Sequence, residues 1–339
     1  MTNKLTDYFS WSSLPRPIIV LAPMAGYTDS AFRQVVKSIT PSVICYTELI
    51  SSDGIFYEGK KTEDLLNFNI SEQPLILQLF GKKPEHFAQA AIKAEKLGFA
   101  GVDLNFACPA RKVVNSCHGG AILKNLPLAE EIIRAVVAST RLPVSIKTRL
   151  GWENADGLTE RVNKWAQLGV SAVIIHGRTV RQVFNGSANW EPIYEVKKNI
   201  KIPITIIGNG DICSLKDFHL KINNLDGVAV GRKTIGNPWL LKEIAENKKD
   251  LKGLLGPLRS KVGKSGIKSQ TKEISFKKKI PIIIRHAKFA EKSTGKRGII
   301  ELRKHLIAYT KGIPGAAELR QKLVSVEKAS EVKDVFNTN

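Results

Sequence analysis

The sequence predicts an α/β protein in which a (β/α)8 TIM barrel is followed by a small bundle of α-helices. Short apolar runs alternate with segments of helical period in the first part of the chain, which is typical of parallel strands covered on both faces. About eight such units in roughly 240 residues fit a closed barrel. After Trp239 the composition becomes basic, and helical patterns without strands follow. Strand spacing, helix period and this change in composition together predict the fold class.

The expected strands are short apolar runs rich in β-branched residues. Three of the segments between them, His86–Leu97, Ala129–Ser139 and Leu158–Leu168, have the spacing of amphipathic helices. No Gly-x-Gly-x-x-Gly motif opens a helix after the first run, which argues against an open dinucleotide-binding sheet. The runs are Ile18–Leu21, Val43–Tyr46, Leu75–Phe80, Val102–Asn105, Val144–Lys147, Ala172–His176, Ile204–Gly208 and Gly227–Val230.

We expect three regions along the chain. Residues 1–242 would form the barrel, residues 243–279 a flexible basic linker, and residues 280–330 a small helical domain. The linker prediction rests on a stretch rich in Lys, Ser and Gly with little periodicity. The helical domain is predicted from apolar periodicity interrupted by glycines. Its expected helices lie at Ile282–Glu291, Ile299–Thr310 and Ala316–Val326.

Positive charge is concentrated in the C-terminal part of the chain. The net charge is +21, and residues 242–339 hold 24 Lys and Arg against 10 Asp and Glu. A basic domain appended to a milder one predicts a polyanionic partner, with RNA or DNA favoured over a membrane. The alternative is a basic surface that is merely solvated.

Cysteine usage and hydropathy exclude several classes of protein. Cys45, Cys108, Cys117 and Cys213 form no C-x-x-C pair and have no accompanying His cluster, so neither a zinc site nor a disulfide scaffold is predicted. No signal-peptide core opens the chain, and no apolar run approaches the ~20 residues of a membrane span. We therefore expect a soluble, cytoplasmic, metal-free protein, and a monomer.

One stretch, Val102–Leu123, concentrates the candidate chemistry. Its strand ends just before Cys108-Pro109, and Pro109 disfavours helix at the residue before it, so the thiol should sit extended at a strand end. A polar amide, a thiol and two cations leave this one strand end. Taken alone, the stretch leaves a buried structural thiol as an equal alternative. The residues concerned are Asn105, Cys108, Arg111 and Lys112.

Polar residues follow nearly every expected strand. In (β/α)8 barrels the active site is built at the C-terminal ends of the strands. Each residue alone has a structural explanation, such as a core histidine or a turn, but their coincidence favours a site. They include Gln78, Asn105, Lys147, Arg149, His176, Arg178, Asn209, Asp211 and Arg232.

The last two strand ends predict a phosphate site. Gly208-Asn209-Gly210 and Gly231-Arg232 offer backbone that can approach a ligand closely, and Arg232 adds a forked cation. Lys147, at an interior strand end, would be costly to bury without an anion beside it. A cofactor with a phosphate and an electron-rich ring would satisfy these groups. Flavin mononucleotide (FMN) is the first candidate and a sugar phosphate the second.

Together these motifs resemble the tRNA-dihydrouridine synthase family, most closely its bacterial B-type branch. The likeness runs from about residue 17 to 320 and includes the basic helical region. The matching segments are Ala22–Asp29, Asp103–Pro109, Val144–Trp152, His176–Thr179, Gly208–Ile212, Gly231–Arg232, Gly236–Trp239, Arg303–His305 and Lys311–Ala316.

The resemblance implies an FMN-containing barrel that, with the helical domain, holds tRNA. NADPH or NADH would reduce the flavin, hydride would pass to C6 of a uracil, and Cys108 would protonate C5. Asn105 would bond the flipped uracil, and Arg111, Lys112, Arg178, Arg303 and Lys304 would contact RNA. The implied cofactor contacts are Pro23, Met24, Ala25, Gln78, Lys147, His176, Asn209, Gly210, Asp211, Gly231 and Arg232.

Two departures and two alternatives stay open. Ala107 stands where the family usually has Gly, and Cys117 is an additional thiol on the loop after Cys108. A thiol with a pKa near 8.5 is protonated at neutral pH yet acidic enough to donate, which suits Cys108. The alternatives are a flavoprotein acting on a small pyrimidine, similar to dihydroorotate dehydrogenases, and an RNA-binding barrel without turnover. The sequence does not predict the modified uridine or the orientation of the helical domain.

Overall fold

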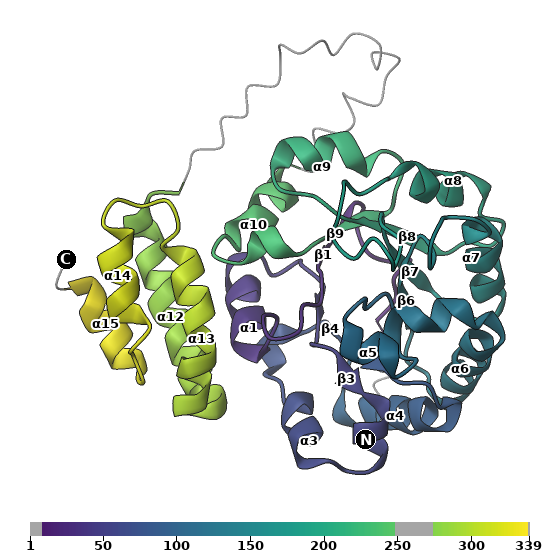
Figure 1. The fold of residues 1–339 in the computed structure, drawn as a ribbon, viewed down its shortest axis with the longest axis horizontal. Coiled ribbons are helices and arrows are strands. Elements are labelled where there is room, and N and C mark those ends of the chain that lie inside the picture. Colours follow the sequence, from purple (N-terminus) through teal and green to yellow (C-terminus); the bar gives the residue numbers. More distant parts are fainter. Residues whose placement is uncertain (1–8, 248–273, 338–339) are drawn as a thin grey trace, which may run out of the picture.

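The computed structural model, which describes residues 9–247 and 274–337, confirms the predicted barrel (Figure 1). All strand pairs are parallel, in the order β1-β9-β8-β7-β6-β5-β4-β2, and β3 pairs with β4. A bridge between Val20 and Ile44 joins β1 to the run before β2, which closes the ring. The strands are β1 (Ile18–Leu21), β2 (Cys45–Tyr46), β3 (Ile50–Ser51), β4 (Leu75–Phe80), β5 (Gly101–Phe106), β6 (Val144–Arg149), β7 (Ala172–His176), β8 (Thr205–Asn209) and β9 (Gly227–Val230).

The strand register brings the polar strand ends to two successive levels at one edge of the barrel. Asn105 on β5 lies opposite Lys147 on β6, and Arg149 on β6 lies opposite His176 on β7. His176 in turn lies opposite Asn209 on β8. Because neighbouring parallel strands end at the same edge of the barrel, residues far apart in sequence meet there.

Helices cover the outside of the barrel and bury their apolar faces against it (Figure 1). The Asp29 carboxylate caps α1 by accepting a hydrogen bond of 2.8 Å from the Phe32 amide. Within the described residues, no helix is long and apolar enough to cross a membrane. The helices are α1 (Ser30–Ile39), α2 (Ser52–Phe56), α3 (Lys60–Leu66), α4 (Pro84–Leu97), α5 (Arg111–Asn115), α6 (Leu126–Ser139), α7 (Leu158–Gln167), α8 (Glu191–Asn199), α9 (Leu215–Ile222) and α10 (Trp239–Glu246), with 3-10 turns η1 (Ile70–Glu72), η2 (Gly119–Lys124) and η3 (Arg232–Thr234).

The C-terminal helices form a bundle with its own core, which includes Leu306, Leu323 and Val332. The predicted linker falls largely on residues 248–273, which lie outside the described part of the chain. The bundle helices are α12 (Phe276–Thr294), α13 (Lys296–Tyr309), α14 (Ala316–Leu323) and α15 (Ala329–Asn337).

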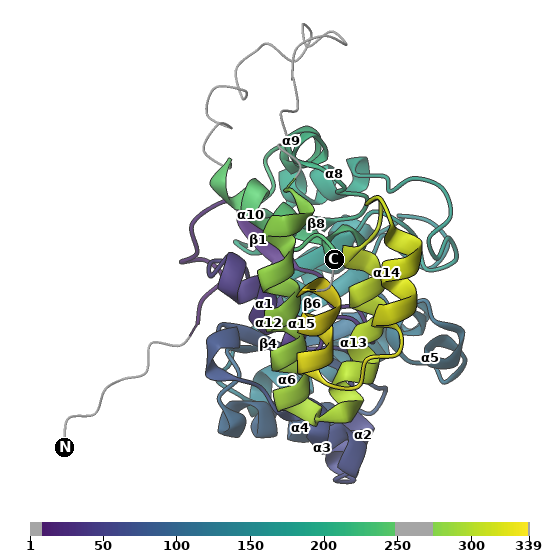
Figure 2. The same cartoon turned by 90° about the vertical axis from the view of Figure 1, so that its left-hand side faces the viewer.

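The bundle packs against α1, so that α12 and α13 lie beside the barrel (Figures 1 and 2). The Phe32 ring of α1 lies 4.7 Å from the His305 ring, and His305 Nε2 lies 3.1 Å from the Tyr27 carbonyl oxygen. A β-carbon built on Gly236 would lie 2.5 Å from the Ala308 carbonyl oxygen, and Gly236 has a φ of +75°. This position therefore requires glycine. We call this contact region the barrel–bundle joint.

Candidate active site

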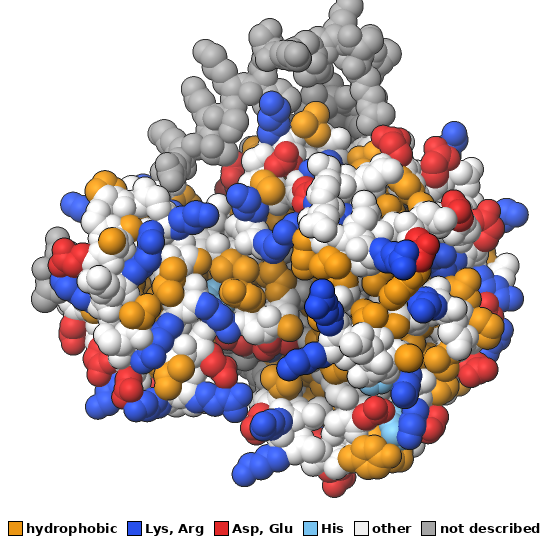
Figure 3. Space-filling model, in the orientation of Figure 1, with side chains coloured by type: hydrophobic (Ala, Val, Ile, Leu, Met, Phe, Trp, Pro, Cys, Tyr) orange, Lys and Arg blue, Asp and Glu red, His pale blue; other side chains and the backbone are white. Residues whose placement is uncertain are grey.

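A cavity of about 1590 Å³ lies at the C-terminal ends of the strands and extends to the bundle. Small-molecule pockets usually enclose about 300–1000 Å³, so this cavity is larger than one such ligand requires. Figure 3 shows a largely hydrophobic hollow with Lys and Arg side chains around it, on both the barrel and the bundle. Its wall includes the loop after β1, the ends of β5 to β9 and the bundle residues Ala308, Tyr309 and Lys311.

Cys108 lines this cavity from the end of β5 and is partly buried. Its backbone amide donates to Asn105 Oδ1 over 2.9 Å, and its carbonyl accepts from the Gly120 amide over 2.9 Å. Burial raises the pKa of the thiol, although Lys147 and Arg149 act in the opposite direction. The thiol is therefore protonated at neutral pH. Of the two explanations for Cys108, exposure to the cavity favours a site.

Asn105 is held from both ends of its amide. Oδ1 accepts from the amides of Ala107 and Cys108, and Nδ2 donates to Gln78 Oε1 over 2.8 Å. Gln78, predicted to bond a flavin ring, is fully buried and does not line the cavity. Its Nε2 donates instead to Asp103 Oδ2 over 2.8 Å. The structure thus places Gln78 beneath the wall of the cavity, behind Asn105.

Lys147 lines the cavity as a cation without a direct partner. Within the described part of the chain its Nζ makes no hydrogen bond or ion pair, and Asp103 and Cys108 act on it only through space. Burial, and then the neighbouring Arg149, lower its pKa to about 8. Since most of the ammonium is still charged at neutral pH, an anionic or hydrogen-bond-accepting ligand would stabilise it.

His176 lines the cavity as a neutral ring. It is 6% exposed, and burial lowers its pKa to about 2, helped by Lys147 and three arginines. Gly210 lies against it, since a β-carbon there would be 3.3 Å from His176 Nε2. A neutral imidazole beside several cations can donate or accept one hydrogen bond toward a bound ring or phosphate.

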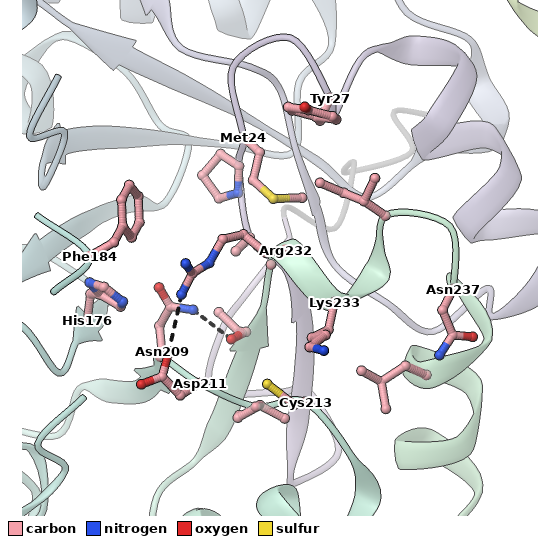
Figure 4. Close-up of a pocket in the computed structure, with 18 of the residues that line it drawn as sticks. Met24, Tyr27, His176, Phe184, Asn209, Asp211, Cys213, Arg232, Lys233 and Asn237 are labelled. Atoms are coloured by element: carbon pink, nitrogen blue, oxygen red, sulfur yellow. Dashed lines mark hydrogen bonds and ion pairs between the residues drawn. The ribbon is translucent and has the colours of Figure 1, made fainter. Parts of the chain in front are cut away.

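The loops after β8 and β9 form the wall shown in Figure 4. Asn209 donates to the Ala229 carbonyl over 2.7 Å, and its side-chain oxygen makes no hydrogen bond within the described residues. Asp211 pairs with Arg178 at 2.7 Å and with Arg232 at 3.3 Å. Arg232 is 57% exposed, so most of its guanidinium is open to the cavity and solvent. Gly231 also lines this wall, on the side of β1.

The loop after β1 supplies Pro23, Met24 and Ala25 to the adjoining wall, beside Gly231. The Met24 carbonyl accepts from the amides of Tyr27 and Thr28, which makes a tight turn. Glu48 accepts a hydrogen bond from the Gly26 amide. These bonds fix the backbone of the turn next to the cavity.

Arg178, predicted to contact RNA, is placed differently. It is 3% exposed, and its guanidinium donates to the Asp211 carboxylate and to the carbonyls of Asn185 and Gly186. This burial, with four of its five N–H donors already bonded, leaves it no surface that an RNA backbone could reach. Arg178 instead braces the loops after β7 and β8.

The other predicted RNA contacts lie nearer the surface. Arg111 and Lys112 are exposed on α5, next to Cys108 in sequence. Lys304 lies over the Tyr27 ring, 5.2 Å from its centroid, beside the cavity mouth. Arg303 donates to the carbonyls of Ser325 and Val326, so part of its guanidinium ties α13 to the segment that follows α14.

Two further cavity residues were given no role from the sequence, although Arg149 was among the strand-end residues that favour a site. Arg149 is buried and donates to the Ala107 carbonyl over 2.9 Å, and its guanidinium lies 5.6 Å from the Phe184 ring centroid. Phe184 is half exposed and also lies 4.8 Å from the Arg232 guanidinium. Arg149 had a signal, since it is a charged residue at a strand end. Phe184 sits in an irregular loop and had none.

The second thiol of this region, Cys117, lies outside the cavity. Cys117 is exposed on the turn after α5 and does not line the cavity, whereas Cys108 does. Ala107 is 5% exposed, and its methyl lines the cavity wall. The described residues contain no group of three or more His, Cys, Asp or Glu side chains that could hold a metal ion.

Comparison with known proteins extends the likeness over nearly the whole chain. A family model described as "Dihydrouridine synthase (Dus)" matches residues 20–338. A probable tRNA-dihydrouridine synthase 1 of Synechocystis sp. is 32% identical over 94% of this chain and 85% of its own. The corresponding figures are 33%, 93% and 93% for a probable tRNA-dihydrouridine synthase of Aquifex aeolicus, and 33%, 94% and 91% for tRNA-dihydrouridine synthase B of Pseudomonas syringae pv. tomato. Among solved structures, a mandelate oxidase mutant with a monooxide FMN adduct aligns with 70% of this chain and 74% of its own, at 18% identity and a TM-score of 0.49.

Proposed function

Because this chain belongs to the dihydrouridine synthase family, we propose that it reduces the C5–C6 double bond of uridines in tRNA. The observation that carries the proposal is Cys108, a partly buried thiol that faces the large cavity from a strand end and is protonated at neutral pH. Three relatives that align with at least 93% of this chain bear the name tRNA-dihydrouridine synthase. One of them is a B-type enzyme, in agreement with the branch that the motifs indicate.

FMN is the cofactor that fits the cavity wall. Lys147 offers a cation that has no partner among the described residues, and His176 and Asn209 offer hydrogen-bonding groups at the same edge of the barrel. Arg232, with Gly210 and Gly231 beside it, would hold the phosphate end. Bound there, FMN would supply hydride for C6 of the uracil, after reduction by NADPH or NADH.

Cys108 would provide the proton that completes the reduction. Hydride addition at C6 leaves negative charge at C5 and O4, so a donor is needed near C5. Burial holds the proton on Cys108, while Lys147 and Arg149 limit how far its pKa rises. The thiol is therefore protonated before the reaction, and its partial exposure gives a route for a new proton afterwards.

The remaining cavity space and the cationic surroundings suit a flipped nucleotide of tRNA. Turning a base out of its stack costs a few kcal/mol, about what several phosphate contacts can offset. Arg111, Lys112 and Lys304 would make such contacts. Asn105 keeps one Nδ2 hydrogen that Gln78 does not use, and this hydrogen would donate to a uracil oxygen.

The test is reduction of unmodified tRNA by the purified holoenzyme. With NADPH, we expect dihydrouridine in the RNA, measured by mass spectrometry after nuclease digestion, and FMN released on denaturation. Cys108→Ala should lower dihydrouridine formation by about 10²–10⁴-fold, while NADPH still bleaches the flavin absorbance.

Cys117→Ala is the matched control, because Cys117 is exposed and outside the cavity. It should retain the parental rate. Loss of activity in Cys117→Ala but not in Cys108→Ala would contradict this assignment and show that Cys117 donates the proton. A flavin-loaded protein that forms no dihydrouridine in any unmodified tRNA would disprove the function.

A further inference from the structure

A continuous buried hydrogen-bond chain runs from Asp103 to the backbone of Cys108. Asp103 accepts from Ser145 Oγ over 2.7 Å and from Gln78 Nε2 over 2.8 Å. Gln78 Oε1 then accepts from Asn105 Nδ2, and Asn105 Oδ1 accepts from the Cys108 amide over 2.9 Å. Asp103, Gln78 and Ser145 are fully buried, and Asn105 is 5% exposed, so no water competes along most of this chain.

The two ends of this chain fix the direction of every bond in it. A backbone amide can only donate, so Asn105 must turn its oxygen toward Cys108 and its nitrogen toward Gln78. Gln78 must then turn its oxygen toward Asn105 and its nitrogen toward Asp103. Burial raises the pKa of Asp103 to about 7, and its Oδ2 accepts from this nitrogen whether the group is ionised or carries its proton on the other oxygen. A reversed amide anywhere along the chain would place two donors or two acceptors face to face inside the barrel.

We propose that Asp103 is a positioning residue, which orients Gln78 and Asn105 and thereby holds the backbone turn that presents the Cys108 thiol. Asp103 itself does not line the cavity, so its influence passes through the two amides. Asp103 thereby sets the position of the proton donor, a role that rests on the proposed function. Displacement of a reacting group by about 1 Å can cost 10²-fold in rate.

The turn is also held from its other side by η2, and the bond from the Cys108 amide to Asn105 fixes the end that η2 does not hold. The Gly120 amide donates to the Cys108 carbonyl, and a β-carbon on Gly119 would lie 3.0 Å from the Cys108 β-carbon. The amide of Cys108 thus depends on Asn105, and its carbonyl on η2. Loss of the first contact leaves the turn anchored at one end only.

The first test measures the thiol directly and needs no turnover. Cys117 and Cys213 are exposed and are replaced by Ser, while Cys45 is buried, so iodoacetamide labels Cys108. In this background Asp103→Leu removes the acceptor with a side chain of similar size. A turn freed into water loses the burial that raises the thiol pKa, and each unit by which the pKa falls gives about tenfold more thiolate. We therefore expect about tenfold faster labelling of Cys108 at pH 7.5 and a lower pH midpoint of the labelling profile.

Asp103→Asn is the conservative comparison. Its oxygen can accept from Gln78 while its nitrogen donates to Ser145, so the chain keeps its direction. Labelling should stay within about twofold of the parent. Ser145→Ala removes the other bond to Asp103 and leaves the chain to Cys108 intact, so it should also label at the parental rate. If Asp103→Leu does not fold, Asn105→Ala breaks the last link near the cavity and should show the same faster labelling.

Two results would overturn the proposal. One is parental labelling in the folded variants that break the chain, and the other is an equal rise in Asp103→Asn. In the RNA assay, Asp103→Leu should lose about 100-fold in dihydrouridine formation with parental flavin content, and Asp103→Asn should recover it. Because the labelling needs neither flavin nor RNA, a failure of the proposed function would leave the labelling result unchanged.

Discussion

The barrel–bundle joint and the cavity wall both bury polar side chains, but the two regions differ in the hydrogen-bond partners that these side chains have. In the joint, His286 Nδ1 lies 3.2 Å from the Tyr309 hydroxyl, and His305 Nε2 lies 3.1 Å from the Tyr27 carbonyl oxygen. Both rings are fully buried, and burial lowers both pKa values, so the joint holds neutral histidines. In the cavity wall, the side chains of Lys147 and His176 make no hydrogen bond within the described residues and face open space.

This difference distinguishes a structural cluster from a binding site. A buried polar group is stabilised when a partner lies within the fold. Each joint histidine has such a partner at one ring nitrogen, while its second nitrogen has none within the described residues. The cavity wall leaves a cation and a neutral imidazole without such partners, which is the arrangement expected where a ligand completes the site. Buried histidines alone would not separate the two regions, because both contain them.

The largest effect is expected in the joint, from Gly236→Ala. This glycine has a φ of +75° and faces Ala308, whereas Gly98 has a φ of +82° with nothing within 4 Å. Gly98→Ala should therefore cost only the backbone term, about 1–2 kcal/mol. Gly236→Ala should cost a further ~1–3 kcal/mol from overpacking. Denaturant unfolding measures both, and equal losses would show that the joint can yield at no cost.

The next effect is expected in the cavity wall, from Lys147→Met. Loss of a charge-assisted contact should weaken FMN binding by about 10–100-fold, measured by flavin fluorescence titration of the apoprotein. Lys164→Met, on the exposed face of α7, is the control and should bind normally. Since Lys147 has no direct partner in the described chain, the free energy of unfolding of the apoprotein should not fall. A marked loss of stability would instead give Lys147 a structural role like that of the joint histidines.

His305 in the joint should make the free energy of unfolding depend on pH. Burial first, and then Lys304, lower the pKa of His305 from 6.5 to about 3. Between these values the unfolded chain binds a proton that the folded chain does not, so this stability is complete above pH 6.5 and is lost as the pH falls. His305→Gln keeps a donor for Tyr27 without this titration. Its unfolding free energy should depend less on pH, by ~1.4 kcal/mol per pH unit between pH 4 and 6.

Several other groups titrate in that range, and their contributions cancel when the stability of His305→Gln is compared with that of the parent. Burial raises the pKa of Asp29 to about 6, which opposes the histidines because the folded chain then binds the extra proton. His286 also lies in the joint, 4.9 Å from His305 between ring centroids. Both are present in the parent and the variant. Parallel stability curves for the two chains would contradict a neutral His305.

The smallest effect is expected on RNA binding, from Arg111→Met. Arg111 is exposed, and loss of one phosphate contact should reduce the slope of log affinity against log salt by about 0.7–0.9. Arg178→Met provides the contrast, because Arg178 is buried against Asp211. It should lower thermal stability and leave the salt slope unchanged. A change of slope in Arg178→Met would mean that this arginine leaves Asp211 to meet RNA.

The sequence by itself determined the barrel, the expected helices of the bundle and the position of Cys108 at a strand end. Strands β1, β4, β7 and β9 have the predicted bounds. A short, continuous apolar run between amphipathic helices has to be buried on both faces, and a parallel barrel strand buries it in this way. Strand ends also carry local signals, such as the Pro109 that follows Cys108. These features depend on residues close together in the chain.

Only the tertiary structure decided which strand-end residues face the cavity and which serve one another. Gln78 turns to Asp103 and Asn105, and Arg178 turns to Asp211, 33 positions away. The seat of the bundle on α1 depends likewise on Phe32 meeting His305 and on the space that Gly236 leaves for Ala308. Such pairings depend on distances that close only when the barrel closes, so residue type and spacing cannot specify them.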